Sequence, residues 1–263
     1  MFKPKILIAA ITVFVLAGAL LFNLIQSQHV VPILMYHQLV SVSNPKYKLA
    51  VSADSFDRQM SFLRKYHYNV LSLEELGEMI TKKKKIPPKT VAITFDDGYK
   101  DTYTLAFPIL KKYNIPATLF IIVNEVERIQ GDRVSWQDIK EMQASGLVII
   151  GSHTIGPEPL VNIKSEQEIK RQIFDSKKIL EEKLGRKVNT FSYPEGLFNP
   201  AIRKMVIKAG YKVAVATNPG KNYPDDDIFA LKRLRVSPTS DNLLVFWINT
   251  TGLYNFIREH RHK

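Results

Sequence analysis

The sequence contains no cysteine. This absence excludes a disulfide scaffold, a thiolate zinc site, an iron–sulfur cluster and a cysteine nucleophile. Acidic residues are also few, because the 263 residues include 25 Asp and Glu against 37 Lys and Arg, a formal net charge of +12. No glycine-rich phosphate loop follows a predicted strand, which argues against a nucleotide-binding fold. A basic chain of this kind binds either nucleic acid or the anionic polymers of a cell envelope.

The N-terminus favours the envelope. Lys3 and Lys5 precede an uncharged, largely apolar run over residues 6–25, which as a helix matches a hydrocarbon core of about 30 Å. The flanking lysines predict that the N-terminus stays in the cytoplasm. Residues 1–29 are therefore predicted to be a single-pass cell-membrane anchor with the remainder extracytoplasmic. The alternative is a secreted protein after signal cleavage, because residues 17–19 match a small-residue cleavage pattern. Nucleic acid is not expected as a partner.

Beyond residue 30 short apolar runs alternate with amphipathic helices. Strands are predicted at 30–36, 70–71, 90–95, 117–123, 147–151, 190–193 and 213–217, and helices at 52–66, 72–80, 102–113, 136–145, 165–184 and 200–209. Two of these helices open with a capping-box pattern, Ser72-x-x-Glu75 and Ser165-x-x-Glu168. The alternation predicts one α/β domain over residues 30–263, with a parallel sheet and helical crossovers. About seven such units favour a barrel over an open sheet.

Reactive side chains follow three of these strands. Asp96 and Asp97 come directly after the strand at 90–95, and His153 follows the one at 147–151. Adjacent carboxylates project in different directions, so one can bind a metal ion while the other takes a proton. Alternatively, Asp-Gly is turn chemistry and His153 is a structural residue. If Asp97 and His153 meet, their oxygen and nitrogen donors suit zinc.

Several motifs together resemble the polysaccharide deacetylases, the NodB-homology group of carbohydrate esterase family 4. They are Thr94-Phe95-Asp96-Asp97-Gly98, Gly151-Ser152-His153-Thr154 and Phe191-Ser192-Tyr193-Pro194-Glu195-Gly196, in the order and spacing of that family. The opening Pro32-Ile33-Leu34-Met35-Tyr36-His37 and the run Leu231-Lys232-Arg233-Leu234-Arg235-Val236 are similar to the branch of poly-N-acetylglucosamine deacetylases. The resemblance covers most of the chain after residue 30.

The resemblance implies a distorted (β/α)7 barrel and one divalent metal ion, zinc or else Mn, Co or Ni. It assigns the general base to Asp96, metal ligands to Asp97 and His153, and a further active-site histidine to His37. Tyr193, Pro194 and Glu195 correspond to the rim that contacts the substrate. The implied activity is hydrolysis of N-acetyl groups on an N-acetylglucosamine-containing polysaccharide of the envelope or of the cell exterior.

The sequence departs from the family at three positions. A second metal-binding histidine is expected four residues after the first, but residue 157 is proline. Glu158 is one residue further on and offers an oxygen ligand in its place. Glu195 stands where the family often has an aromatic residue, and Ser192 stands where other branches have an arginine that orients the base. The alternative function is therefore a weak or inactive membrane-anchored relative that binds glycan without cutting it.

Overall fold

The computed structural model describes residues 31–42, 49–128, 130–217 and 227–251, together with Thr12, Val13 and Gly18. The predicted anchor at residues 1–29 lies outside these ranges except for those three residues, so it stays a prediction. Within the described part, no helix is both long enough and apolar enough to cross a membrane.

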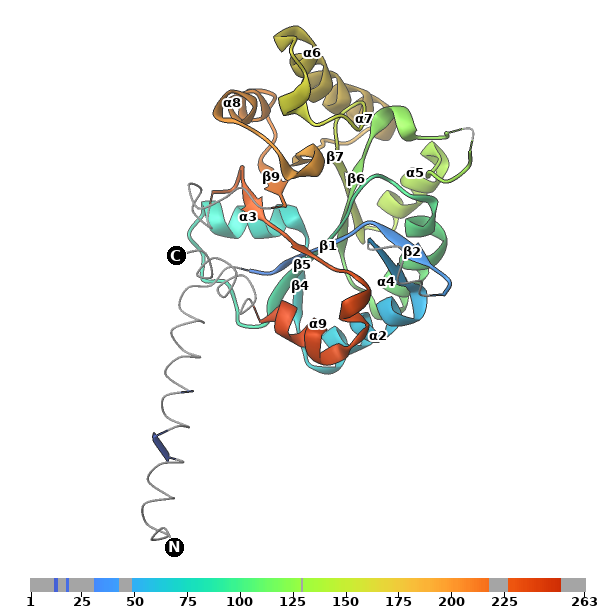
Figure 1. Cartoon of the computed structure of the whole chain (residues 1–263), viewed down its shortest axis with the longest axis vertical. Helices are drawn as coiled ribbons and strands as arrows, with labels where there is room; N and C mark the ends of the chain where they lie inside the picture. The colour runs from blue at the N-terminus through green and yellow to red at the C-terminus, as the bar shows by residue number, and fades with distance from the viewer. Residues whose placement is uncertain are drawn as a thin grey trace, which may run out of the picture.

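One parallel sheet organises the molecule (Figure 1). Its strands follow the order β10-β9-β8-β7-β6-β5-β1-β11, and β4 pairs with β5 beside this path. The bounds are β1 Ile33–Tyr36, β4 Asn69–Leu71, β5 Thr90–Phe95, β6 Ala117–Ile121, β7 Val148–Ser152, β8 Thr190–Ser192, β9 Val213–Ala216, β10 Leu231–Lys232 and β11 Leu234–Arg235. A small separate sheet pairs β2, Gln38–Val40, with β3, Ala50–Ser52. The predicted parallel sheet with helical crossovers is confirmed.

The two ends of this sheet are consecutive in the sequence. Leu231–Lys232 pairs with β9, and Leu234–Arg235 pairs with β1. A single short segment therefore joins the two ends, and Arg233 lies between its two strands. The sheet is in this way nearly closed into a barrel, which is consistent with the predicted (β/α) barrel. The sequence patterns predict no strand at 231–235, because strands of two residues carry no readable periodicity.

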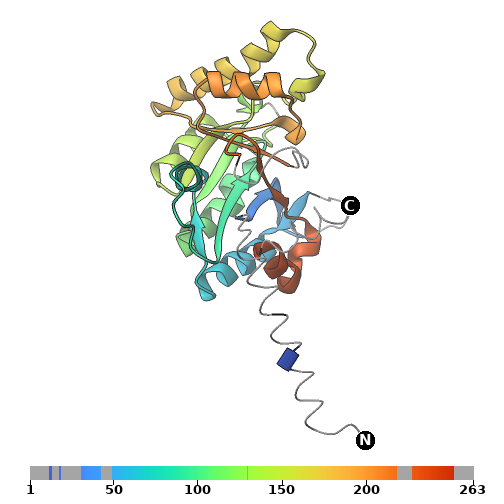
Figure 2. The same ribbon diagram turned by 90° about the vertical axis from the view of Figure 1, so that its left-hand side faces the viewer.

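Helices surround this ring (Figures 1 and 2), and α3 also packs against its inner core. Their bounds are α2 Ala53–Lys65, α3 Leu73–Thr81, α4 Phe107–Tyr113, α5 Trp136–Ala144, α6 Glu166–Lys170, α7 Ser176–Leu184, α8 Pro200–Lys208 and α9 Leu243–Thr250. The helix predicted at 165–184 is confirmed as α6 and α7 joined by a π-helical turn at Arg171–Asp175. Ser72 and Glu75 form the predicted capping box, whereas at Ser165 the side chain accepts from the Glu168 amide.

Two apolar cores hold the sheet. The larger joins its outer face to the covering helices and includes Leu34, Phe95, Leu119 and Phe191. The smaller collects Ile33, Ala92, Phe120, Val213, Val215 and Leu231 from five strands of the ring, so these side chains face its interior. Leu73 and Leu76 of α3 join this inner core. At 25 cal/mol per Å² of buried apolar surface, such cores dominate the free energy of folding, and they fix the strand ends on which the site is built.

Candidate active site

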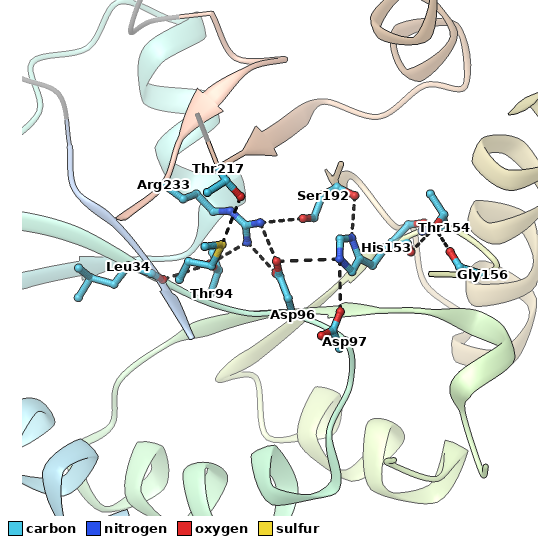
Figure 3. A network of polar contacts seen from close by, with 12 residues as sticks. Leu34, Thr94, Asp96, Asp97, His153, Thr154, Gly156, Ser192, Thr217 and Arg233 are labelled. Carbon is cyan, nitrogen blue, oxygen red and sulfur yellow. Dashed lines mark hydrogen bonds and ion pairs between the residues drawn. The ribbon is translucent and has the colours of Figure 1, made fainter. Parts of the chain in front are cut away.

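The sequence-predicted acids and His153 lie together at the carboxyl edge of the sheet. Asp96 and Asp97 follow β5, and His153 follows β7, which is separated from β5 only by β6. Because these strands are parallel, their carboxyl ends meet at one edge. The His153 Nε2 atom lies 3.5 Å from Asp97 Oδ1 and 4.0 Å from Asp96 Oδ2 (Figure 3). The prediction that these three side chains converge is confirmed.

Asp96 forms a buried, two-armed ion pair with Arg233. Arg233 Nη1 donates to Asp96 Oδ1 at 2.6 Å, and Nη2 donates to Oδ2 at 2.7 Å. The side chains are 1% and 4% exposed, so solvent does not screen the pair. Burial by itself would raise the pKa of Asp96, but the Arg233 guanidinium outweighs burial and lowers that pKa to about 2. Asp96 is therefore ionised at neutral pH and held in one orientation.

Arg233 was assigned no role by the sequence analysis. Its guanidinium also donates to Thr94 Oγ1 at 3.2 Å and to Ser192 Oγ at 2.9 Å (Figure 3). Ser192 occupies the position where other branches of the resembling family carry an arginine. Here an arginine reaches the same carboxylate from the segment that closes the barrel. The run at 231–236 alternates apolar residues with three basic ones, Lys232, Arg233 and Arg235, and which of them reaches the site depends on closure of the ring.

His153 is oriented by the backbone of β8. Its Nδ1 atom lies 2.8 Å from the Ser192 carbonyl oxygen. A carbonyl only accepts hydrogen bonds, so Nδ1 carries a proton, and in the neutral imidazole Nε2 is the nitrogen that can bind a metal ion and that faces the two carboxylates. A hydrogen bond of this kind fixes the tautomer and the ring orientation of metal-binding histidines. Ser192 therefore contacts both His153 and Arg233.

His37 follows β1 and belongs to the same electrostatic cluster. Burial lowers the pKa of His37, the charges of Asp96 and Asp97 oppose this change, and Arg233 and His153 reinforce it. Its Nδ1 atom is buried, and no hydrogen-bond partner for it is found in the described ranges. The predicted proximity of His37 to the site, across nearly 60 residues of sequence, agrees with these interactions. Its role stays a prediction.

Three turns at this edge place a residue other than glycine in the left-handed backbone region. Asp97 has φ 70°, Thr154 has φ 70° and Glu195 has φ 56°. Side chains with a Cβ atom disfavour this region, and such residues concentrate at functional sites. The turn at Asp97 separates its carboxylate from that of Asp96, which stays in line with β5. This agrees with the prediction that the two acids point in different directions.

The remaining predicted residues lie at the periphery. Pro157 and Glu158 are exposed, and the described structure shows no contact of Glu158 with Asp97 or His153. Tyr193 and Pro194 are buried, whereas Glu195 is exposed at the tip of its turn. The roles of these residues as metal ligand or substrate contacts stay predictions.

Two side chains at this edge offer the donors that a divalent ion requires. Asp97 Oδ1 and His153 Nε2 are close enough to share one ion, and the hydrogen bond to Ser192 leaves Nε2 free to bind it. Over the described ranges, no three His, Asp or Glu side chains are spaced to hold an ion together. The chain thus fits a metal ion with two converging ligands, and a third described ligand is not preformed.

Comparisons with known proteins agree with this geometry. A sequence model of the polysaccharide deacetylase family matches residues 83–214. The chain is 37% identical to the protein YxkH of Bacillus subtilis, covering 79% of this chain and 71% of that protein. It is 31% identical to the poly-beta-1,6-N-acetyl-D-glucosamine N-deacetylase of Staphylococcus aureus strain MSSA476, covering 75% and 72%. The solved structure of the Streptococcus pyogenes deacetylase PplD in complex with acetate superposes with a TM-score of 0.74 at 31% identity, covering 82% and 96%.

The fold, the paired aspartates and His153 thus define a hydrolase of the NodB-homology type. The chain belongs to the polysaccharide deacetylase family. Its relatives include enzymes named as N-deacetylases of poly-N-acetylglucosamine.

Proposed function

We propose that this protein is a metal-dependent enzyme that removes N-acetyl groups from an N-acetylglucosamine-containing polysaccharide of the cell envelope or cell exterior. The observation that carries this proposal is the convergence of Asp96, Asp97 and His153, with Asp96 held by Arg233. The names of the Staphylococcus aureus relative and of the Streptococcus pyogenes structure support the reaction class.

Asp97 and His153 would hold the divalent ion, for which zinc is the first candidate. When bound, such an ion polarises the amide carbonyl and lowers the pKa of water. Glu158 remains the candidate for a third ligand, because it follows Pro157 directly and its side chain is exposed. The Ser192 carbonyl keeps the His153 ring in the tautomer that binding requires.

Asp96 is the proposed acceptor of the proton of the attacking water. Arg233 contributes by keeping Asp96 ionised and by fixing both carboxylate oxygens. The leaving amine must receive a proton, because an amide nitrogen anion is a very poor leaving group. His37 is the proposed donor of that proton or a substrate contact, because it interacts electrostatically with both aspartates.

The test is release of acetate from an acetylated glucosamine oligomer by the purified protein with added Zn²⁺. We expect acetate from the parent protein and almost none from Asp96→Asn. Binding of the oligomer without release of acetate would favour the second candidate, a glycan-binding relative. The observation that favours this second candidate is the exposed Pro157 at the position of the missing histidine ligand.

The proposed location is the cell membrane, with the barrel on the outer side. It rests on the apolar run at residues 6–25 and on the two lysines before it. The protein should then sediment with membranes after a high-salt wash, and a shortened, freely released protein would show signal cleavage instead.

A further inference from the structure

The turn after β8 is rigidly held. The Tyr193 hydroxyl donates to the Phe229 carbonyl at 3.0 Å, and the Tyr193 ring stacks on Phe198 with centroids 4.4 Å apart. Gly196 has φ 72°, and a Cβ atom there would lie 2.3 Å from the Thr217 backbone nitrogen. Only glycine fits so close to the backbone at Thr217, so this side of the turn tolerates no side chain at position 196.

Glu195 lies at the tip of this turn between buried neighbours. Pro194 and Gly196 are buried and Glu195 is exposed. Its φ of 56° and ψ of 7° are in the left-handed region, where glycine or asparagine is favoured. This conformation is unfavourable for a glutamate, and residues held in it at the edge of a site are candidates for a functional role.

The Glu195 carboxylate also has no partner among the described residues. Two other exposed glutamates are paired: Glu78 with Lys82 at 2.6 Å, and Glu166 with Lys170 at 2.6 Å. Glu195 thus presents a free negative charge on a rigid support at the active-site edge. It is three residues from Ser192, which contacts His153 and Arg233, so the two Cα atoms are at most about 10 Å apart.

The proposed reaction creates the cation that such a group binds. Hydrolysis turns a neutral acetamide into acetate and an amine, and the amine becomes a cation when it takes up a proton. In a polymer, a neighbouring unit that was hydrolysed earlier then presents an ammonium group. We propose that Glu195 binds the ammonium group of a glucosamine unit that is already deacetylated, adjacent to the acetylated unit in the site. This inference rests on the proposed function and adds a preference for partly deacetylated chains.

The test compares two oligomers of equal length, one fully acetylated and one with a single free glucosamine unit. For an exposed ion pair we expect the parent protein to show a KM about two- to five-fold lower for the second oligomer. Glu195→Gln should lose this preference, so that its KM for the partly deacetylated oligomer rises to that for the fully acetylated one. Glu182→Gln is the matched control, because it removes the same charge from the outer face of α7 and should keep the preference. Added salt should weaken the preference of the parent protein.

A second variant separates charge from backbone effects. Glycine adopts the left-handed conformation of residue 195 without a steric penalty. Glu195→Gly should therefore fold at least as well as the parent protein and still lose the preference. Retention of the preference in Glu195→Gln would overturn the inference. Calorimetric titration of the Asp96→Asn variant with both oligomers measures their binding affinities without turnover. We expect tighter binding of the oligomer that contains the free glucosamine unit. Equal affinities there would also overturn it, whereas the absence of acetate release from every substrate would refute only the proposed activity.

Discussion

Two regions of the chain contribute differently to the site. Residues 83–214, which match the family, contain Asp96, Asp97, His153 and Ser192. The segments outside that match contribute His37 after β1 and Arg233 between β10 and β11. The matched region places the proposed base and the metal-binding groups, whereas the flanking segments supply His37 and the arginine that sets the charge and orientation of Asp96. The motif around Asp96 therefore does not predict the pKa or the orientation of its carboxylate, because Arg233, its main partner, is 137 residues away in sequence.

The largest effects are expected within the matched region. Asp96→Asn should lower turnover by about 10²–10⁴-fold, the usual cost of losing a general acid or base, and should retain the metal ion. Asp97→Asn should lose metal binding. Acetate release and calorimetric titration with Zn²⁺ measure the two properties. Equal loss of metal in both variants would contradict the division of roles between the two acids. Asp96→Asn removes the carboxylate that pairs with Arg233 and can therefore lower stability. A cooperative denaturation curve for each variant is the control that it is folded.

The next largest effect concerns stability and Arg233, which lies outside the matched region. Arg233→Met leaves Asp96 buried without its counter-charge, which should lower the free energy of unfolding by about 3–5 kcal/mol. Urea denaturation measures this change. Arg235→Met is the control two residues away, where the side chain is exposed, and its effect should stay within about 0.5 kcal/mol. Equal effects of the two variants would show that the pairing of Arg233 with Asp96 adds no measurable stability.

The pH dependence of stability sharpens the same comparison. The pKa of Asp96 falls from its ordinary 3.8 to about 2 in the folded protein. A carboxyl with a depressed folded-state pKa contributes stability that is present above pH 4 and is lost as the pH falls toward 2. The contribution is about 2 kcal/mol. The gap in unfolding free energy between the parent and Asp96→Asn should therefore narrow by this amount between pH 5 and 2. A constant gap would refute the depressed pKa.

The smallest effects concern the loop after His153. Pro157→His adds an imidazole four residues after His153 and should raise the affinity for Zn²⁺. Glu158→Ala should lower that affinity by less than about ten-fold, or about 1.4 kcal/mol, because the side chain is exposed and makes no preformed contact with Asp97 or His153 in the described structure. Isothermal titration of both variants measures the change. Unchanged binding in Glu158→Ala would remove it from the ligand set.

Local patterns were sufficient for most elements of the sheet and for the capping box at Ser72. They were insufficient for β2 and β3, and for α9, which buries two polar residues beside Phe246 and exposes two apolar ones. In α9, Asn249 and Thr250 are buried while Leu244 and Trp247 are 61% and 45% exposed. Asn249 donates a hydrogen bond to the Ser240 hydroxyl, and Thr250 forms one with the Tyr68 hydroxyl, 182 residues away in sequence. An inward-facing polar residue is predictable only when its partner is known.

The sequence by itself determined the alternation of strands and helices and the family motifs at three strand ends. Because side chains after parallel strands meet at one edge, it also determined that Asp96, Asp97 and His153 would converge. Only the tertiary structure decided which charge Asp96 carries and how it is held. The segment at 231–235 reaches Asp96 by pairing with β9 and β1 at once, and this closure brings Arg233 into a buried contact. Electrostatic interactions follow distance and burial in space, and neither is encoded in the spacing of residues along the chain.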